Sequence, residues 1–320
     1  MPQRLRPSAA FVCTALALTV VVAPFSISSA VAATTDETNP TVGEAGLLDT
    51  IENAQPAILD KLSNSSLRAR GYVAADAVEL PEEPGDPVAV GGNEFSLTTT
   101  PELDLGRGET LTSNSVAFVG EDVTQVIADK GGESAAIVTV IDNAGAPTEY
   151  AYPSTGTDRI EIGESGGAFF YAGEELVGVA LAPWAKDAEG ADVPTHYEIN
   201  GGELVQVVEH RGGGFTYPVV ADPWYGESLI SQITKYPNEE RLAVYGTSWY
   251  AAVQWNPAIP TQVADEFMRV VGTTYRTAGN KSQVWCHAFG SGTYKQPWNI
   301  EHWRPYYGDA NMLATGCNPT

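Results

Sequence analysis

Between Gly71 and Pro223 the chain alternates short runs rich in Val, Ile, Thr and Tyr with turns of Gly, Pro and Asp, as in "SVAFVG", "AAIVTVID" and "ELVGVALAP". Such runs are typical of β-strands, because β-branched and aromatic side chains suit a pleated surface. In "THYEINGGELVQVVEH", Gly201 and Gly202 can take the positive φ that a two-residue hairpin turn requires. The sequence therefore predicts an antiparallel, sandwich-like, all-β region over residues 71–223.

The segment before this region, residues 33–70, is predicted to be flexible or helical, and its residues 34–45 are polar and poor in aromatic side chains. Its apolar residues recur at near-helical spacing, and Pro56 interrupts the pattern. Two short helices are therefore predicted, with the apolar positions Leu47, Ile51, Ile58 and Leu62.

The first residues carry Arg4 and Arg6, then an apolar run from Ala9 to Ala23, then an Ala-Val-Ala site. This order is typical of a secretory signal peptide over residues 1–32. The run is shorter than the roughly 20 residues that span a bilayer. We therefore expect a secreted, extracellular or surface-associated protein without a stable membrane anchor, with Cys13 removed in the leader.

Two cysteines remain after the leader, Cys286 and Cys317. In an exported chain such a pair predicts a disulfide, because an oxidising compartment preserves the bond. The alternative is a metal site using Cys286 and His287. Structural zinc usually takes four ligands from paired spacings such as C-x-x-C, which the sequence lacks, so we predict no metal. No cofactor motif is visible.

Charge divides the chain. The 17 basic and 40 acidic residues give a net charge of -23; residues 33–223 hold 8 basic and 33 acidic residues, and residues 224–320 hold 7 of each. We take this shift as a domain boundary. The acidic part argues against nucleic acid as a partner, because phosphate binding needs basic patches.

The last 97 residues hold six of the seven Trp and eight of the 14 Tyr. Residues 241–255 predict one or two strands, and residues 282–289 predict another strand. Residues 261–271 predict a helix capped by Thr261. The apolar face of that helix is Val263, Phe267, Val270 and Val271. Residues 224–320 are therefore predicted to form a small, disulfide-linked α+β domain.

"GESGGAFFYAGEELVG", from Gly163, resembles the nucleophile region of chymotrypsin-like serine proteases, with Ser165 at the reactive position. In that family the His and Asp precede the Ser, whereas all four His of this chain follow it. The hydrolase elbow G-x-S-x-G requires a helix next, yet the following residues favour a hairpin. We predict a glycine-rich turn.

Three C-terminal motifs, "CH", "KQPWNIEHWRP" and "GCNP", resemble the bacterial family known as domain of unknown function 2599. Ile300 and His302 depart from the family pattern, which has Leu and Pro there. The resemblance implies no activity. The matching residues are Cys286, His287, Trp298, Asn299, Glu301, Trp303, Arg304, Pro305, Cys317, Asn318 and Pro319.

Within this motif, His287 and Glu301 are weak candidates for an acid/base pair. The alternative is structural: Glu301 pairs with Arg304, while Trp298 and Trp303 pack beside the disulfide. His302 is a poor catalytic candidate, because the family pattern has Pro there.

Residues 182–223 resemble a module found upstream of variable C-terminal domains in secreted actinobacterial proteins, which implies export and modularity. Taken together, these features predict a secreted, modular binding protein that is not an enzyme. Its partner would be a glycan or a protein at or outside the cell surface. A secreted hydrolase of envelope polymers, using His287 and Glu301, is the alternative. A third possibility makes residues 33–223 a propeptide or chaperone for the C-terminal domain.

Overall fold

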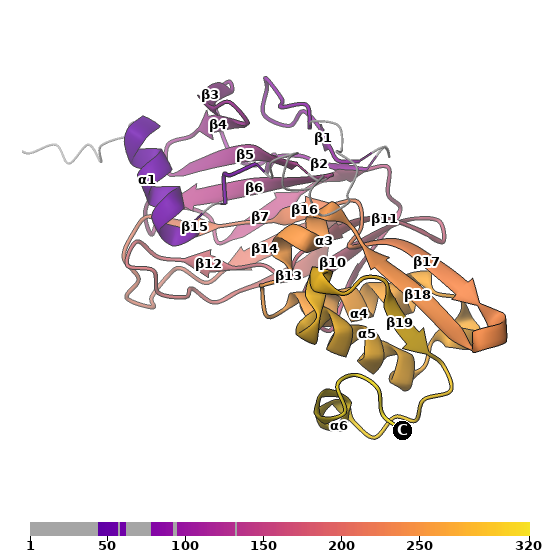
Figure 1. Cartoon of the computed structure of the whole chain (residues 1–320). Helices are drawn as coiled ribbons and strands as arrows, with labels where there is room; N and C mark the ends of the chain where they lie inside the picture. Colours follow the sequence, from indigo (N-terminus) through magenta and orange to yellow (C-terminus); the bar gives the residue numbers. More distant parts are fainter. Residues whose placement is uncertain (1–43, 57, 62–77, 92–94, 132) are drawn as a thin grey trace, which may run out of the picture. The chain divides into compact units, whose positions relative to one another are not determined.

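The computed structural model describes residues 44–56, 58–61, 78–91, 95–131 and 133–320 (Figure 1). The chain divides into two compact units, Met1–Pro40 and Thr41–Thr320. The first unit, with the expected signal peptide, lies outside the described residues. The second unit contains every residue that the structure describes.

The largest element is a ten-stranded sheet in which every paired strand runs antiparallel. Eight strands follow the order β3-β4-β5-β6-β16-β11-β10-β9, and β15 joins β6 to β12. The bounds are β3 Glu109–Thr112, β4 Ser115–Val119, β5 Val123–Gly131, β6 Ser134–Ile141, β9 Arg159–Ile162, β10 Ala168–Ala172, β11 Glu175–Ala180, β12 Ala185–Lys186, β15 Val219–Ala221 and β16 Trp224–Gly226.

Two smaller antiparallel sheets complete the β region. One joins β1 (Val88–Ala89), β2 (Ser96–Leu97) and β8 (Ser154–Thr155), and the other joins β13 (Thr195–Asn200), β14 (Glu203–Val208) and β7 (Glu149–Tyr152). The predicted hairpin is confirmed: β13 and β14 meet at Gly201 and Gly202, whose φ angles are 61° and 92°.

Central strands β5 and β6 are buried on both faces. Because side chains alternate along a strand, Ile127 and Ile137 enter the core shared with the small sheets, whereas Val126 and Val138 face the opposite way. That second face is covered by helix α1 (Glu44–Ala54), through residues that include Ile51 (Figure 1). The predicted sandwich-like β region is thus confirmed.

Helix α1 is the first of the two helices expected before the β region, and its Leu47 and Ile51 are buried as predicted. Ile58 is buried as well. Most of the second predicted helix, including Leu62, lies outside the described residues.

The C-terminal region is α+β, as predicted. Its antiparallel sheet has the order β17-β18-β19, and helices α4 and α5 lie beside it (Figure 1). The bounds are β17 Ile230–Tyr236, β18 Arg241–Gly246, α3 Ser248–Val253, α4 Ile259–Val270, α5 Ala278–Gly290, β19 Trp298–Glu301 and α6 Asp309–Ala314, with 3-10 turns at Pro237–Glu239, Thr273–Tyr275 and Gly292–Tyr294.

The strand predicted over 282–289 is wrong, because these residues belong to α5. Thr277 caps this helix by accepting a hydrogen bond from the backbone N–H of Asn280 at 3.2 Å. Val284 and Ala288, one helical turn apart, both enter the core. Tertiary burial of this face therefore overrides the strand preference of the Val-Trp-Cys run.

The prediction for 241–255 is right only in its first half. Strand β18 ends at Gly246, and Thr247 then caps α3 by accepting a hydrogen bond from Tyr250 N at 3.1 Å. This cap converts the second half into a helix.

Helix α4 begins earlier than predicted, at Ile259, and Pro260 rather than a Thr261 cap marks its first turn. Phe267 is buried as expected. Val270, at 44% exposure, lies outside the core, because the helix ends there and the extended Val271 turns inward instead.

The C-terminal helices share a hydrophobic core with one end of the large sheet. Phe169 and Val179, on β10 and β11, pack in the same cluster as Trp249 and Phe267. Gln262 on α4 donates from Nε2 to the carbonyl of Ala180 at 2.7 Å. Two regions that differ sharply in charge are therefore joined by burial as well as by the chain.

Candidate functional site

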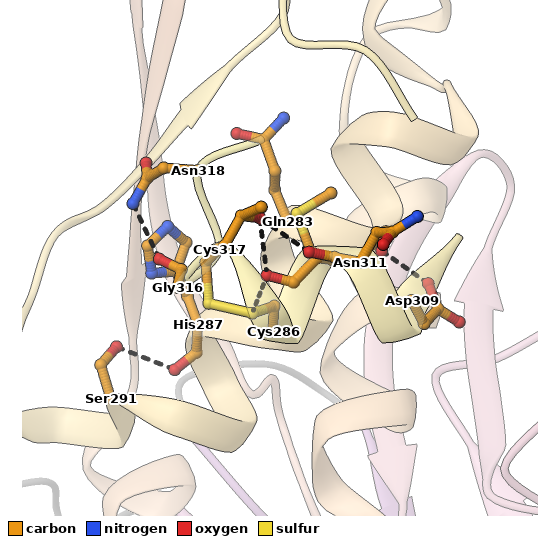
Figure 2. Close-up of a disulfide and its surroundings, with 12 residues drawn as sticks. Gln283, Cys286, His287, Ser291, Asp309, Asn311, Gly316, Cys317 and Asn318 are labelled. Carbon is orange, nitrogen blue, oxygen red and sulfur yellow. Dashed lines mark hydrogen bonds between the residues drawn. A yellow bond between two sulfur atoms is a disulfide. The ribbon is translucent and has the colours of Figure 1, made fainter. Parts of the chain in front are cut away.

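A disulfide ties helix α5 to the C-terminal tail, which confirms the predicted pairing (Figure 2). Cys286 and Cys317 lie 5.5 Å apart between Cα atoms, and both are buried. Met312 of α6 packs against them. The backbone N–H of Cys317 donates to the Met312 carbonyl at 2.8 Å. The bond therefore closes α6 onto α5.

The segment that carries the Trp-Asn motif is β19, and its side chains serve the fold. Trp298 is fully buried and donates from Nε1 to the carbonyl of Gly292 at 3.0 Å. The amide oxygen of Asn299 accepts a hydrogen bond from the Arg241 guanidinium at 2.6 Å. Both residues thus fix the edge strand to its neighbours.

Gln283, inside α5, holds the other end of β19. Its Oε1 accepts from the backbone N–H of Glu301 at 2.9 Å, and its Nε2 donates to the Glu301 carbonyl at 3.0 Å. A buried amide that satisfies both backbone groups of one residue fixes helix and strand in one register. The role of Gln283 could not be predicted from the sequence, because a single Gln in an apolar run gives no signal of its partner.

Arg304 anchors the tail. Its guanidinium forms an ion pair with the Glu301 carboxylate, as predicted, and donates from Nη1 to the carbonyl of Pro319 at 2.9 Å. The same guanidinium lies 4.5 Å from the Trp303 ring centroid. Asn318 donates from Nδ2 to the Gly316 carbonyl at 2.8 Å (Figure 2).

The two motif tryptophans do not flank the disulfide as expected. Trp298 belongs to the main C-terminal core and Trp303 is 52% exposed. Trp285 is the tryptophan that packs beside the two cysteines. Trp285 and Cys286 share helix α5, whereas Trp298 lies on β19.

His287 lies on α5 and is almost fully buried. Burial is the main cause that lowers its pKa to about 4, and the charge of Lys295 acts in the same direction. Its Nε2 atom has no hydrogen-bond partner among the described residues. The carboxylate of Glu301 is held by Arg304 instead. The imidazole is therefore neutral at physiological pH and closed off from solvent.

His302, in place of the family Pro, forms a hydrogen bond between its Nδ1 and Asn280 Nδ2 at 3.0 Å. Its ring lies 5.3 Å from that of Tyr275. These contacts give His302 a packing role at the start of α5.

The Ser165 segment is a turn between β9 and β10, as predicted. The N–H of Gly163 donates to the Gly167 carbonyl at 2.8 Å, and Gly166 has a φ of 84°. The backbone N–H of Glu164 donates to the Asp265 carboxylate at 2.9 Å. The turn therefore docks the β region onto α4.

The seven tryptophans divide by environment. Trp249 and Trp298 are fully buried, and Trp184, Trp224 and Trp285 are half-buried. The exposed aromatic side chains of the C-terminal region are Tyr236 at 37%, Trp255 at 71%, Phe289 at 60%, Tyr294 at 86%, Trp303 at 52%, Tyr306 at 46% and Tyr307 at 62%.

A groove of about 720 Å³ opens where the β region meets α3. Three tryptophans line it: Trp184, Trp224 and Trp255. This volume lies within the range of small-molecule sites, which are concave, largely apolar and hold few polar groups. The sequence could not reveal the groove, because its walls come from four separate parts of the chain.

The described part of the chain contains no cluster of three or more His, Cys, Asp or Glu side chains that could hold a metal ion. Within the same residues, no helix is both long enough and apolar enough to cross a bilayer.

The C-terminal region is thus a small α+β fold closed by a disulfide and by the residues of three short motifs. Residues 231–320 match the family described as protein of unknown function (DUF2599), which confirms the resemblance. Uncharacterized proteins of Mycobacterium bovis and Mycobacterium tuberculosis are 47% identical over 47 residues, or 13% of this chain and 31% of each relative. The chain therefore covers about a third of these curated relatives. No solved structure matches the chain significantly.

Proposed function

We propose that this protein acts outside the cell as a binding protein, through aromatic side chains of its C-terminal region. The observation that carries the proposal is the exposure of Trp255, Tyr294 and Trp303. Large aromatic side chains left in water cost solvation free energy, and in proteins they concentrate at binding surfaces, where burial by a partner recovers it.

Two further features support an extracellular place of action. The first residues have the order of a secretory leader, and a disulfide persists best in an oxidising compartment. The hydrolase alternative gains no support from the candidate pair, because His287 is buried with a pKa lowered to about 4 and Glu301 is held by Arg304.

Two measurements test the proposal. The first is immunodetection of the chain in culture medium and envelope fractions, where we expect it without residues 1–32. The second is retention of the purified chain on insoluble envelope glycan and on arrays of secreted proteins. A variant with Trp255→Ala, Tyr294→Ala and Trp303→Ala should lose retention. A matched Ile199→Ala control, exposed at 45% on β13, should not.

Detection only in the cytoplasm, or retention on neither material, would overturn the proposal. Equal retention of the triple variant and the control would show that the aromatic side chains are not the binding groups.

A further inference from the structure

Three indole side chains line the groove at the β-region boundary, and the Trp224 ring also carries Lys130 Nζ at 4.8 Å from its centroid. Trp184 follows β11, Trp224 begins β16, and Trp255 follows α3, so three separate segments bring indoles to one hollow. Apolar side chains complete the wall between them, with Leu181 and Pro257 among them. An aromatic face carries partial negative charge and attracts the slightly positive C–H bonds of a flat ligand.

The charged groups of the groove are already engaged with the protein. Lys186 Nζ lies 2.7 Å from the Asp192 carboxylate. The carboxylate of Asp222 is buried and accepts a hydrogen bond from the Trp184 backbone N–H at 3.0 Å. Lys186 is the sole cation among the described residues that line the groove, and it is neutralised in place. A phosphorylated or sulfated ligand would therefore meet no spare positive charge.

Neutral hydrogen-bonding groups remain. Gln55 and Asn256 both line the groove, and Asn256 Oδ1 already accepts a hydrogen bond from the backbone N–H of Ala258 at 2.9 Å. An amide carries donors and an acceptor, which suits ligand hydroxyl groups that also donate and accept. Indole rings, side-chain amides and a Lys186 that is already paired suit a sugar as the ligand, because a sugar has apolar C–H faces and hydroxyl groups at its edge.

A second hollow shares Trp255 with the groove. It has a volume of about 160 Å³, and the other residues that line it are Gln254, Thr293 and Tyr294. None of these is charged. The Tyr294 and Trp255 rings lie 6.4 Å apart between centroids. Trp255 therefore stands between two hollows of the same chemical character, which suits a ligand made of repeated units.

We propose that the two hollows together bind a neutral oligosaccharide chain, with successive sugar units on either side of Trp255. This inference rests on the proposed binding function and adds the site and the ligand class. The acidic charge of residues 33–223, 8 basic against 33 acidic, further disfavours polyanionic glycans through long-range repulsion.

The test is titration of the full purified chain, followed by tryptophan fluorescence and calorimetry. The probes are uncharged tetra- to hexasaccharides of N-acetylglucosamine, glucose, mannose, galactose and arabinose. At least one series should bind, and longer members should bind more tightly than the disaccharide. Trp255→Ala and Tyr294→Ala should each weaken binding by about tenfold or more. Both side chains are mostly exposed, so these variants should fold normally.

Ile199→Ala serves as the control here too, because Ile199 is exposed at 45% and lines neither hollow. Its affinity should stay within about twofold of the unaltered chain. Binding to none of the uncharged series, or equal loss in the control, would overturn the inference. Preferential binding of charged oligogalacturonates or of apolar peptides would overturn the assigned ligand class.

The outcome can be separated from that of the proposed function. If envelope retention depends on the triple substitution while Trp255→Ala alone changes nothing and no sugar binds, the binding function stands and the groove is not its site. If pure sugars bind in the groove but the protein is found only in the cytoplasm, the oligosaccharide site is supported and the proposed extracellular function is wrong.

Discussion

The disulfide should dominate the stability of the C-terminal tail. Cys286 and Cys317 are separated by 31 residues. Closing a loop of that length lowers the entropy of the unfolded chain, which stabilises the native state by roughly 3.5 kcal/mol on the chain-entropy model. A double variant, Cys286→Ala with Cys317→Ala, should lose that stabilisation.

Hydrogen exchange of backbone amides shows which part of the chain loses stability in the double variant. The amides of Met312 and Cys317 donate within the tail, to Gly308 at 3.1 Å and to Met312 at 2.8 Å. If the tail opens locally, their exchange should accelerate by roughly 300-fold, which is the rate equivalent of 3.5 kcal/mol. The amide of Ile137, which donates to Pro223 in the large sheet, is the internal control and should keep its exchange rate.

Reduction of the unaltered protein separates the covalent link from the packing. Reduction keeps both sulfur atoms beside Met312, whereas the double variant removes them. Similar acceleration in both samples is the expected result. Acceleration below about tenfold in the double variant would refute the reasoning, because the link would then contribute less than about 1.4 kcal/mol to holding the tail.

Three other substitutions test the remaining assignments. Gln283→Ala should lower the free energy of unfolding by about 2–3 kcal/mol in urea titrations, because both backbone groups of Glu301 lose their partner. Burial raises the pKa values of Glu266 and Asp222 to about 7, so the folded state binds more protons than the unfolded chain between about pH 4 and 7. The free energy of unfolding should therefore be highest below about pH 4 and should fall as pH rises to about 7. In the Glu266→Gln variant this fall should be smaller by about 3 kcal/mol, because the new side chain does not titrate. An unchanged slope of the urea midpoint against pH would contradict the raised pKa of Glu266. Ser165→Ala should change the free energy of unfolding by no more than about 0.5 kcal/mol, because the hydroxyl accepts one long hydrogen bond, from the backbone N–H of Gly167 at 3.4 Å. A larger change would contradict this minor role.

Local chemistry made some elements predictable from the sequence. The turn at Gly201 and Gly202 follows from the conformational freedom of glycine, and the disulfide follows from having two cysteines after the leader. The Glu301–Arg304 pair lies within one short segment, so its partners could be read together. Each of these features depends on few residues and little on the rest of the fold.

Other elements depended on distant parts of the chain and could not be predicted. Residues 282–289 have the composition of a strand, and they are helical because Val284 and Ala288 meet a core built by other elements. The exposure of each tryptophan could not be predicted either, because composition does not distinguish the buried Trp298 from the exposed Trp303, five residues later. The groove joins four segments that no local pattern connects.

The β region and the C-terminal region share one hydrophobic core, so the stability of each depends on the other. Phe169 and Val179 of the β region pack in one cluster with Trp249 and Phe267 of the C-terminal region. Separating the parts would expose these side chains to water, at a cost of about 1.5–3 kcal/mol for each fully buried one. Strands β10 and β11 therefore contribute to the core of the region that matches the family model. The groove requires both parts as well, because Trp184 and Trp255 come from opposite sides of the charge boundary.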